Sequence, residues 1–151
     1  MSWKRRVLAD LQELCAAFED SYIEHRYFLD LLMGEVIFIS DEFMDDGERE
    51  EFDEKVEEGF MERYIPIPQD SSEEGYRDME EFIETVEDAD LREKLYIAIN
   101  GRGAFRRFKD VLLDYPKERE RWFGFRDARV AERVQEWLEC EGIELVDAKT
   151  R

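Results

Sequence analysis

Residues 97–113, IAINGRGAFRRFKDVLL, contain the end of one helix, a tight turn and the start of a second helix. Asn100 and Gly101 are residue types that tolerate the left-handed backbone conformation found at a helix C-terminus. Gly103 gives a second unrestricted backbone position before the next helix. Because the connection is very short, the pattern predicts two helices that fold back on one another as a helical hairpin.

The second helix of this hairpin is predicted to be apolar on one face and cationic on the other. Its apolar residues recur at three- and four-residue steps, which is typical of a face packed against a core. They are Ala104, Phe105, Phe108, Val111, Leu112 and Tyr115. The basic residues Arg106, Arg107 and Lys109 lie mainly off this stripe.

The start of this helix is a candidate site for an anionic group. A helix N-terminus has unpaired N–H groups and a partial positive charge, which favour phosphate or carboxylate. The predicted site residues are Gly101, Gly103, Arg102, Arg106, Arg107 and Lys109. Neither P-loop spacing nor the strand that precedes a dinucleotide-binding fingerprint is present. The alternative is that the glycines only form a turn and the arginines pair with the chain's own carboxylates.

Length and composition predict one folded domain over residues 1–151. The chain is 43% hydrophobic, which is too apolar for a disordered chain even though 42% of its residues are charged. No signal peptide or membrane span is recognisable, so a cytoplasmic protein without a membrane contact is expected. Cys15 and Cys140 show no metal-ligand spacing and are expected to be buried thiols.

The net charge of −19 is distributed unevenly along the chain. Residues 41–90 hold 22 acids and 4 bases, whereas residues 91–134 hold 12 bases and 7 acids. An acidic middle is therefore followed by a basic helical segment. The two segments either neutralise each other within the fold or leave an acidic face for a basic partner.

The pattern before the central hairpin predicts both helices and strands. We expect a first helix over residues 3–19, a β-hairpin over residues 25–39 that turns at Gly34, and a helix over residues 48–61. Pro66 and Pro68 predict an edge strand over residues 63–68. Ser71 and Glu74 form a capping-box pattern for a helix that ends near residue 86, and Asp88 or Asp90 is expected to cap the next helix.

The remainder of the chain predicts one long helix and a last strand. Pro116 breaks the preceding helix, and the long helix is expected to run from about residue 117 to the stop signal at Gly142. Its predicted apolar face contains Trp122, Phe123, Phe125, Ala128, Ala131, Val134, Trp137 and Leu138. Residues 143–146 alternate like a strand, and residues 148–151 are expected to fray. The whole pattern predicts an α+β fold, mostly helical with about five or six helices and a small antiparallel sheet built on the N-terminal hairpin.

Catalytic and metal-binding motifs are weak in this sequence. His25 is the only histidine, which argues against triad chemistry and multi-histidine metal sites. A calcium loop around Gly47 would place Met44 at a ligand position and lacks the final glutamate, so neither a metal nor a cofactor is predicted. Pairs of carboxylates are too numerous for spacing to select one for acid–base chemistry.

Nucleic acid is an improbable ligand for the basic segment. The phenylalanines that interleave with its arginines fall on the predicted core stripe, and a chain of this charge is repelled by a polyanion. The inverse hypothesis, an acidic surface that competes with nucleic acid for a basic protein, fits the charge.

Several motifs resemble those of a known bacterial group, the uncharacterised protein family numbered 0158. The similar segments are residues 27–30 (YFLD), 34–37 (GEVI), 63–68 (RYIPIP), 101–110 (GRGAFRRFKD) and the helix over residues 122–137. The resemblance implies the same architecture but no activity, because the family has none established. Residues 31–33 (LLM) form an apolar turn where the family usually has a polar one, which suggests an exposed contact point.

The leading functional hypothesis is therefore a non-catalytic binding or regulatory protein that recognises an anionic group through residues 101–109. The alternatives are an enzyme acting on a phosphorylated or carboxylated small molecule, an acidic mimic that binds a basic protein, and a structural subunit of a homo-oligomer. The last alternative would bury residues 31–33 against a second copy.

Overall fold

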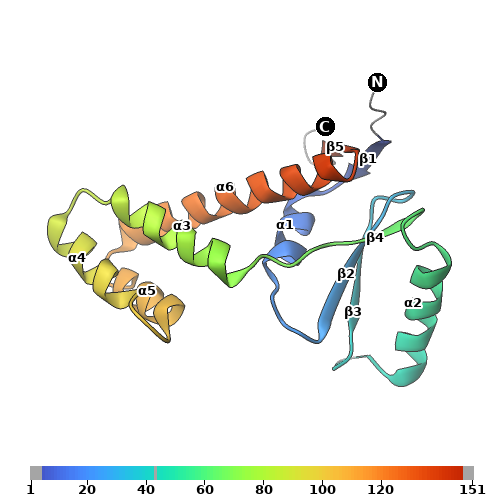
Figure 1. Cartoon of the computed structure of the whole chain (residues 1–151), viewed down its shortest axis with the longest axis horizontal. Helices are drawn as coiled ribbons and strands as arrows, with labels where there is room; N and C mark the ends of the chain where they lie inside the picture. The colour runs from blue at the N-terminus through green and yellow to red at the C-terminus, as the bar shows by residue number, and fades with distance from the viewer. Residues whose placement is uncertain (1–4, 43, 148–151) are drawn as a thin grey trace. The chain divides into compact units, whose positions relative to one another are not determined.

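The computed structural model describes residues 5–42 and 44–147, and it has an α+β fold with six helices and two small sheets in this part of the chain (Figure 1). The contacts between residues divide the chain into two compact units. The helical unit comprises residues 71–129, and the sheet unit comprises the described residues up to 70 together with those from 130 onward. The long helix α6 (Pro116–Cys140) contributes residues to both units.

The sheet unit is built on an antiparallel hairpin. Strands β2 (His25–Asp30) and β3 (Val36–Ser40) pair in antiparallel register, and β4 (Tyr64–Pro66) adds to the other side of β2. Gly34 turns the hairpin with φ +74°, and a Cβ there would lie 1.8 Å from the carbonyl oxygen of Leu8. The predicted hairpin, its turn and the edge position of the proline-containing strand are confirmed.

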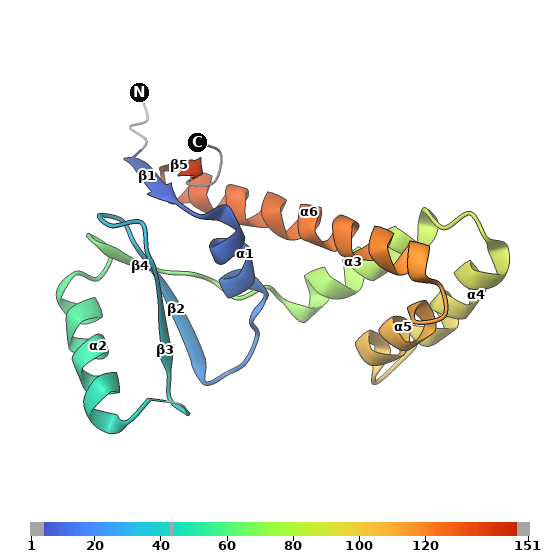
Figure 2. The ribbon, with the colours of Figure 1, turned by 180° about the vertical axis from the view of Figure 1, so that it is seen from behind.

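The acidic helix α2 (Asp46–Glu58) lies beside β3 (Figure 2). It buries only Val56, which joins a small cluster with Phe28, Ile37, Ile39 and Tyr64. The predicted helical extension through Phe60 and Met61 is wrong, because the helix ends at Gly59 and both side chains are about half exposed. Phe52 of the same helix is partly buried against this cluster, so Val56 and Phe52 together attach the highly charged helix to the sheet.

The first predicted helix is wrong over its first half. Residues Trp3 and Lys4 lie outside the described part, but Arg5–Ala9 form strand β1 and only Leu11–Glu19 form helix α1. The side chains of β1 alternate between exposed and buried, as a strand requires, and Asp10 caps α1 by accepting from the backbone N–H of Gln12. Strand β1 pairs in parallel with β5 (Ile143–Asp147), so the predicted last strand exists but belongs to a second sheet.

The core of this unit is mainly aliphatic, and its largest cluster includes Leu14, Leu29, Ile65, Val134 and Leu138. The predicted burial of both cysteines is wrong: Cys15 is only partly buried and Cys140 is exposed on α6. The predicted fraying of residues 148–151 lies outside the described residues.

The helical unit contains α3 (Ser72–Glu84), α4 (Ala89–Ala98), α5 (Ala104–Leu112) and the first part of α6. Ser71 caps α3 by accepting from the N–H of Glu74, and Asp88 caps α4, as predicted. Aromatic rings dominate the core, with Phe108 and Trp122 centred 4.8 Å apart and Phe82 and Trp122 5.3 Å apart, both edge to face.

Three residues assigned to apolar faces by their spacing are exposed instead. Phe105 is 42% exposed, Phe123 is 41% exposed and Ala128 is also at the surface. The spacing of apolar residues predicts which face of a helix packs against the core, but not how much of that face the neighbouring elements cover. Phe105 lies at the edge of the covered face, where its ring reaches over Gly75 of α3.

Candidate functional site

The predicted helical hairpin is confirmed, and its turn depends on two glycines. Helices α4 and α5 lie side by side in both ribbon views (Figure 1, Figure 2). Gly101 has φ +80° and Gly103 has φ +78°, a left-handed conformation that any side chain would strain. These two positions let the chain reverse within residues 99–103.

The N-terminus of α5 has no side-chain cap. Gly103 occupies the N-cap position, and the first turn contains no acidic residue. Backbone pairing begins only where the N–H of Arg107 donates to the carbonyl of Gly103, at 3.0 Å. The N–H groups of the first turn therefore have no side-chain cap at the positive end of the helix dipole.

This end differs from the N-termini of four other helices. Each of those is closed by an oxygen of a side chain: Asp10 for α1, Asp45 for α2, Ser71 for α3 and Asp88 for α4. Such a cap satisfies donors that would otherwise need water or a ligand. Helix α5 depends on the flexibility of glycine instead.

The side chain of Arg107 stabilises the turn by hydrogen bonds to backbone carbonyls. Its Nε donates to the carbonyl of Ala98 at 2.8 Å, its Nη2 donates to the carbonyl of Asn100 at 2.5 Å, and its Nη1 donates to the carbonyl of Arg102. The planar guanidinium thus satisfies carbonyl groups at the C-terminal end of α4 and in the loop. Of the predicted basic residues, Arg107 is the one whose donors are already used within the fold.

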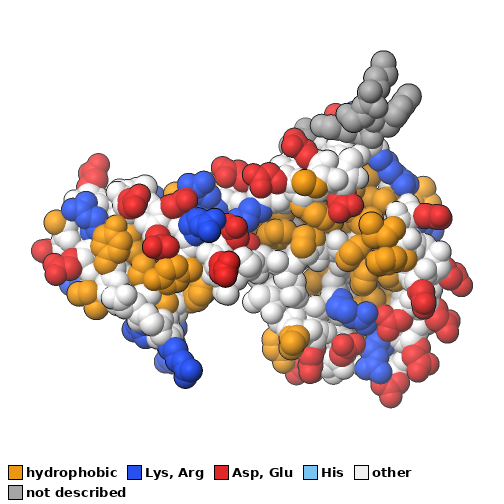
Figure 3. All heavy atoms as spheres, viewed as in Figure 1, with side chains coloured by type: hydrophobic (Ala, Val, Ile, Leu, Met, Phe, Trp, Pro, Cys, Tyr) orange, Lys and Arg blue, Asp and Glu red, His pale blue; other side chains and the backbone are white. Residues whose placement is uncertain are grey.

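The other predicted basic residues are exposed. The side chain of Arg106 is 89% exposed, and its Nε lies 4.0 Å from Oδ2 of Asp110, a distance at which an exposed pair contributes little. Arg102 and Lys109 are exposed, and neither makes an ion pair within the part of the chain that the structure describes. Figure 3 shows cationic side chains at the tip of this hairpin.

A groove of about 510 Å³ adjoins the start of α5. One wall comes from α3, with Tyr76 and Arg77, and the other includes Gly103, Ala104 and the exposed ring of Phe105. Glu73 and Glu80 also line this groove, whereas Arg102, Arg106 and Lys109 do not. Lys109 instead lines a separate hollow of about 390 Å³ against α6. Arg102 and Arg106 are therefore presented at the exposed surface beside the groove rather than inside it.

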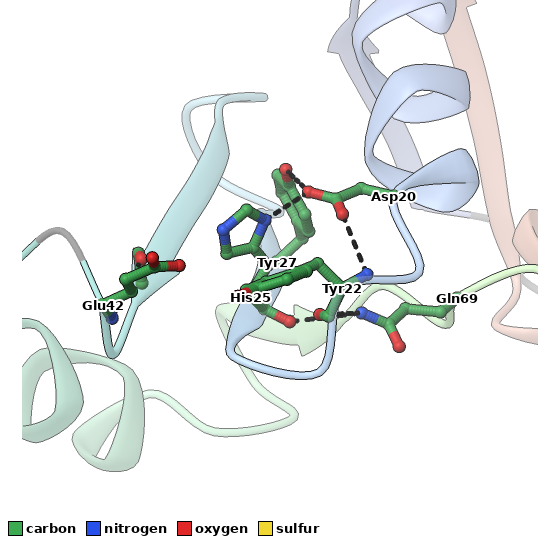
Figure 4. A network of polar contacts seen from close by, with 7 residues as sticks. Asp20, Tyr22, His25, Tyr27, Glu42 and Gln69 are labelled. Atoms are coloured by element: carbon green, nitrogen blue, oxygen red, sulfur yellow. Dashed lines mark hydrogen bonds and ion pairs between the residues drawn. The ribbon is translucent and has the colours of Figure 1, made fainter.

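His25 belongs to a local network in the sheet unit (Figure 4). Its Nδ1 lies 2.6 Å from Oδ2 of Asp20, and the hydroxyl of Tyr27 donates to the same oxygen at 2.5 Å. Burial and the Asp20 carboxylate raise the pKa of Tyr27 to about 12, so the phenol stays protonated and keeps donating. The Nε2 atom of His25 is buried. Through Asp20, this network joins the end of α1 to the start of β2.

Buried carboxylates with basic partners were missed in the sequence. Asp30 is 1% exposed and receives a two-pronged contact from Arg63, with both distances 3.1 Å. Asp78 is 2% exposed and accepts from Arg126 at 2.8 Å. In a chain with 41 acids, spacing alone gives no signal that distinguishes these two from exposed ones.

The described residues provide neither a metal-binding cluster nor a membrane-spanning helix. No group of three or more histidine, cysteine, aspartate or glutamate side chains there is arranged to hold a metal ion. Asp45 and Asp46, which precede Gly47 in the rejected calcium loop, respectively cap α2 and pair with Arg49. None of the described helices is both long and apolar enough to cross a bilayer.

These features define a small, strongly acidic α+β protein with an uncapped cationic helix start. The chain matches the model of the uncharacterised protein family UPF0158 over residues 4–150, and it belongs to that family. A UPF0158 protein of Pseudomonas aeruginosa is 31% identical over 140 residues, covering 93% of this chain and 87% of the relative.

Longer relatives occur in Chlamydia. UPF0158 proteins of Chlamydia pneumoniae and Chlamydia trachomatis are 31% and 30% identical over 133 residues, which is 87% of this chain but only 40% of theirs. No solved structure gives a significant match. The comparisons thus place the chain in a family without an established activity.

Proposed function

We propose that this chain is a non-catalytic binding protein that recognises an anionic group, carried by a partner, on the surface formed by the α4–α5 turn and the start of α5. The observation that carries the proposal is the uncapped N-terminus of α5 with the exposed cations Arg102 and Arg106 beside it. A partial positive charge, free N–H donors and guanidinium groups all favour the same kind of ligand.

The arrangement favours recognition over catalysis. Arg102 and Arg106 stand on an open surface, outside the neighbouring groove, where water is not excluded from a reacting group. Arg107 and the glycines hold the turn, and Arg102, Arg106 and Lys109 contact the ligand. This division of roles refines the set of six residues that the sequence suggested.

The test compares two charge-reversed proteins for their captured partners in cell extract. Arg102→Glu/Arg106→Glu alters the proposed surface, and Arg6→Glu/Lys117→Glu makes the same charge change at exposed residues outside it. We expect a partner held by wild type and by the Arg6/Lys117 variant to be lost from the Arg102/Arg106 variant, with circular dichroism unchanged in all three. Equal capture by both variants would contradict the proposal.

A further inference from the structure

Two turns at one end of the three-stranded sheet display apolar side chains to solvent. The turn between β2 and β3 exposes Leu32 and Met33, which are 65% and 60% exposed. The turn before β4 exposes Phe60 and Met61, which are 52% and 51% exposed. All four lie in the sheet unit, and together they form what we call the two-turn surface.

The two turns are fastened to each other. The N–H of Leu31 donates to the carbonyl of Arg63 at 2.7 Å, which joins their backbones directly. The buried carboxylate of Asp30 accepts from the N–H groups of Leu32 and Met33 at 2.9 and 3.1 Å, and it also binds the guanidinium of Arg63. Hydrogen bonds therefore hold together the two backbone segments that carry the exposed side chains.

Met61 has an unfavourable backbone conformation for its residue type. Its φ of +66° is the only positive value among the described non-glycine residues. A methionine gains nothing locally from this conformation, and strain of this kind persists where the surroundings enforce it. Here the N–H of Met61 donates to the carbonyl of Tyr64 at 2.8 Å, which holds the exposed side chain in place.

Acidic residues predominate beside the two turns, where Arg63 and Arg5, which donates to the carbonyl of Glu62, are basic neighbours. Glu57, Glu58 and Glu62 flank the second turn and Glu35 follows the first, and all four are exposed. Figure 3 shows apolar side chains gathered over this end of the sheet and acidic ones over α2. An apolar surface with an acidic rim complements a segment that is both apolar and cationic.

We propose that the two-turn surface binds a basic amphipathic helix of a partner protein. The flexible thioethers of two methionines adapt to varied apolar side chains, and the glutamates meet the lysines or arginines on the helix flanks. The proposal concerns a different surface and an opposite ligand charge from the α5 site, so either can fail without the other.

The test is a fluorescence anisotropy titration with a labelled 18-residue peptide of leucine and lysine arranged as an amphipathic helix. A scrambled peptide of equal composition controls for simple attraction to an acidic protein. Leu32→Ser/Met61→Asn removes apolar contacts without changing charge, and asparagine tolerates the left-handed conformation. Ile23→Ser is the matched control, because Ile23 is 90% exposed in the same unit but lies outside the two turns.

We expect the ordered peptide to bind wild type at least tenfold more tightly than the scrambled one. The double variant should lose at least tenfold in affinity, whereas Ile23→Ser should lose less than twofold, with thermal unfolding unchanged in both. Equal binding of the two peptides, or equal loss in the two variants, would overturn the proposal. Light scattering that shows a dimer dissolved by the double variant would also overturn it, because a second copy would then occupy the surface.

Discussion

The two units of this molecule differ in charge and in the kind of core that holds them. Residues 71–129 hold 15 acids and 12 bases, a net charge of −3, whereas the rest of the chain holds 26 acids and 10 bases, a net charge of −16. The helical unit packs aromatic rings edge to face, and the sheet unit packs mainly aliphatic side chains. The uneven charge along the sequence thus corresponds to one strongly acidic unit and one unit that is close to neutral.

The largest expected effect concerns the aromatic core of the helical unit. Phe108 is fully buried against Phe82 and Trp122, so Phe108→Ala should lower the free energy of unfolding by about 4 kcal/mol. The matched change Phe105→Ala, on the same helix but 42% exposed, should cost about 1 kcal/mol or less. Urea unfolding followed by circular dichroism measures both, and equal losses would contradict the described packing.

A smaller effect is expected at the buried carboxylate of the sheet unit. Asp30→Asn should cost about 2 kcal/mol, because it weakens the contacts to Arg63 and to the β2–β3 turn. Burial acts to raise the pKa of Asp30, but hydrogen bonds from Arg63, Met33 and Leu32 outweigh it and lower the pKa below the ordinary value.

The lowered pKa gives this prediction a pH dependence. The stabilisation is complete above the ordinary aspartate pKa of about 3.9 and is lost as the pH falls below it toward the lowered value. Wild type should therefore lose more stability between pH 5 and pH 3 than Asp30→Asn does, as measured by urea midpoints. Identical losses in the two proteins would show that Asp30 is not held as described.

Two adjacent arginines of α5 should behave differently. Arg107→Met removes three hydrogen bonds to backbone carbonyls and should cost about 2 kcal/mol, whereas Arg106→Met should change stability by no more than about 0.5 kcal/mol. Thermal unfolding of the two variants gives the comparison. If Arg107→Met were neutral, the guanidinium would not be closing the turn.

The smallest effect concerns the strained turn of the sheet unit. Met61→Gly should stabilise the protein by about 0.5 kcal/mol, because glycine adopts φ +66° without strain. Met33→Gly, at a similarly exposed position without positive φ, should instead destabilise it by a similar amount. Changes of the same sign at both positions would remove the argument that Met61 is strained.

Much of the fold could be predicted from residue patterns, and the failures have physical causes. The β2–β3 hairpin, the caps Ser71 and Asp88 and the glycine turn at 101–103 follow from local chemistry. Strand β1 was misread as helix because its partner is β5, over a hundred residues further along the chain, and no local pattern reports such pairing.

The candidate site was predictable in its place but not in the roles of its residues. The glycines and the run of basic residues indicate a cationic helix start, and the structure has one. The sequence pattern gives Arg106 and Arg107 the same predicted role, yet only Arg107 donates hydrogen bonds to the carbonyls of the turn. Whether Arg106 or Arg107 faces the turn depends on the rotation of the helix about its axis and on the conformation of the loop. Residue spacing predicts neither of these at the end of a helix.

The most direct test of the central claim is a ¹H–¹⁵N nuclear magnetic resonance titration of the protein with inorganic phosphate. We predict saturable shifts concentrated at the backbone amides of Gly103, Ala104, Phe105 and Arg106, which are lost in Arg102→Glu/Arg106→Glu and kept in Arg6→Glu/Lys117→Glu. Shifts scattered over all basic residues, or no shift at the start of α5, would contradict the claim that this helix end recognises an anionic group.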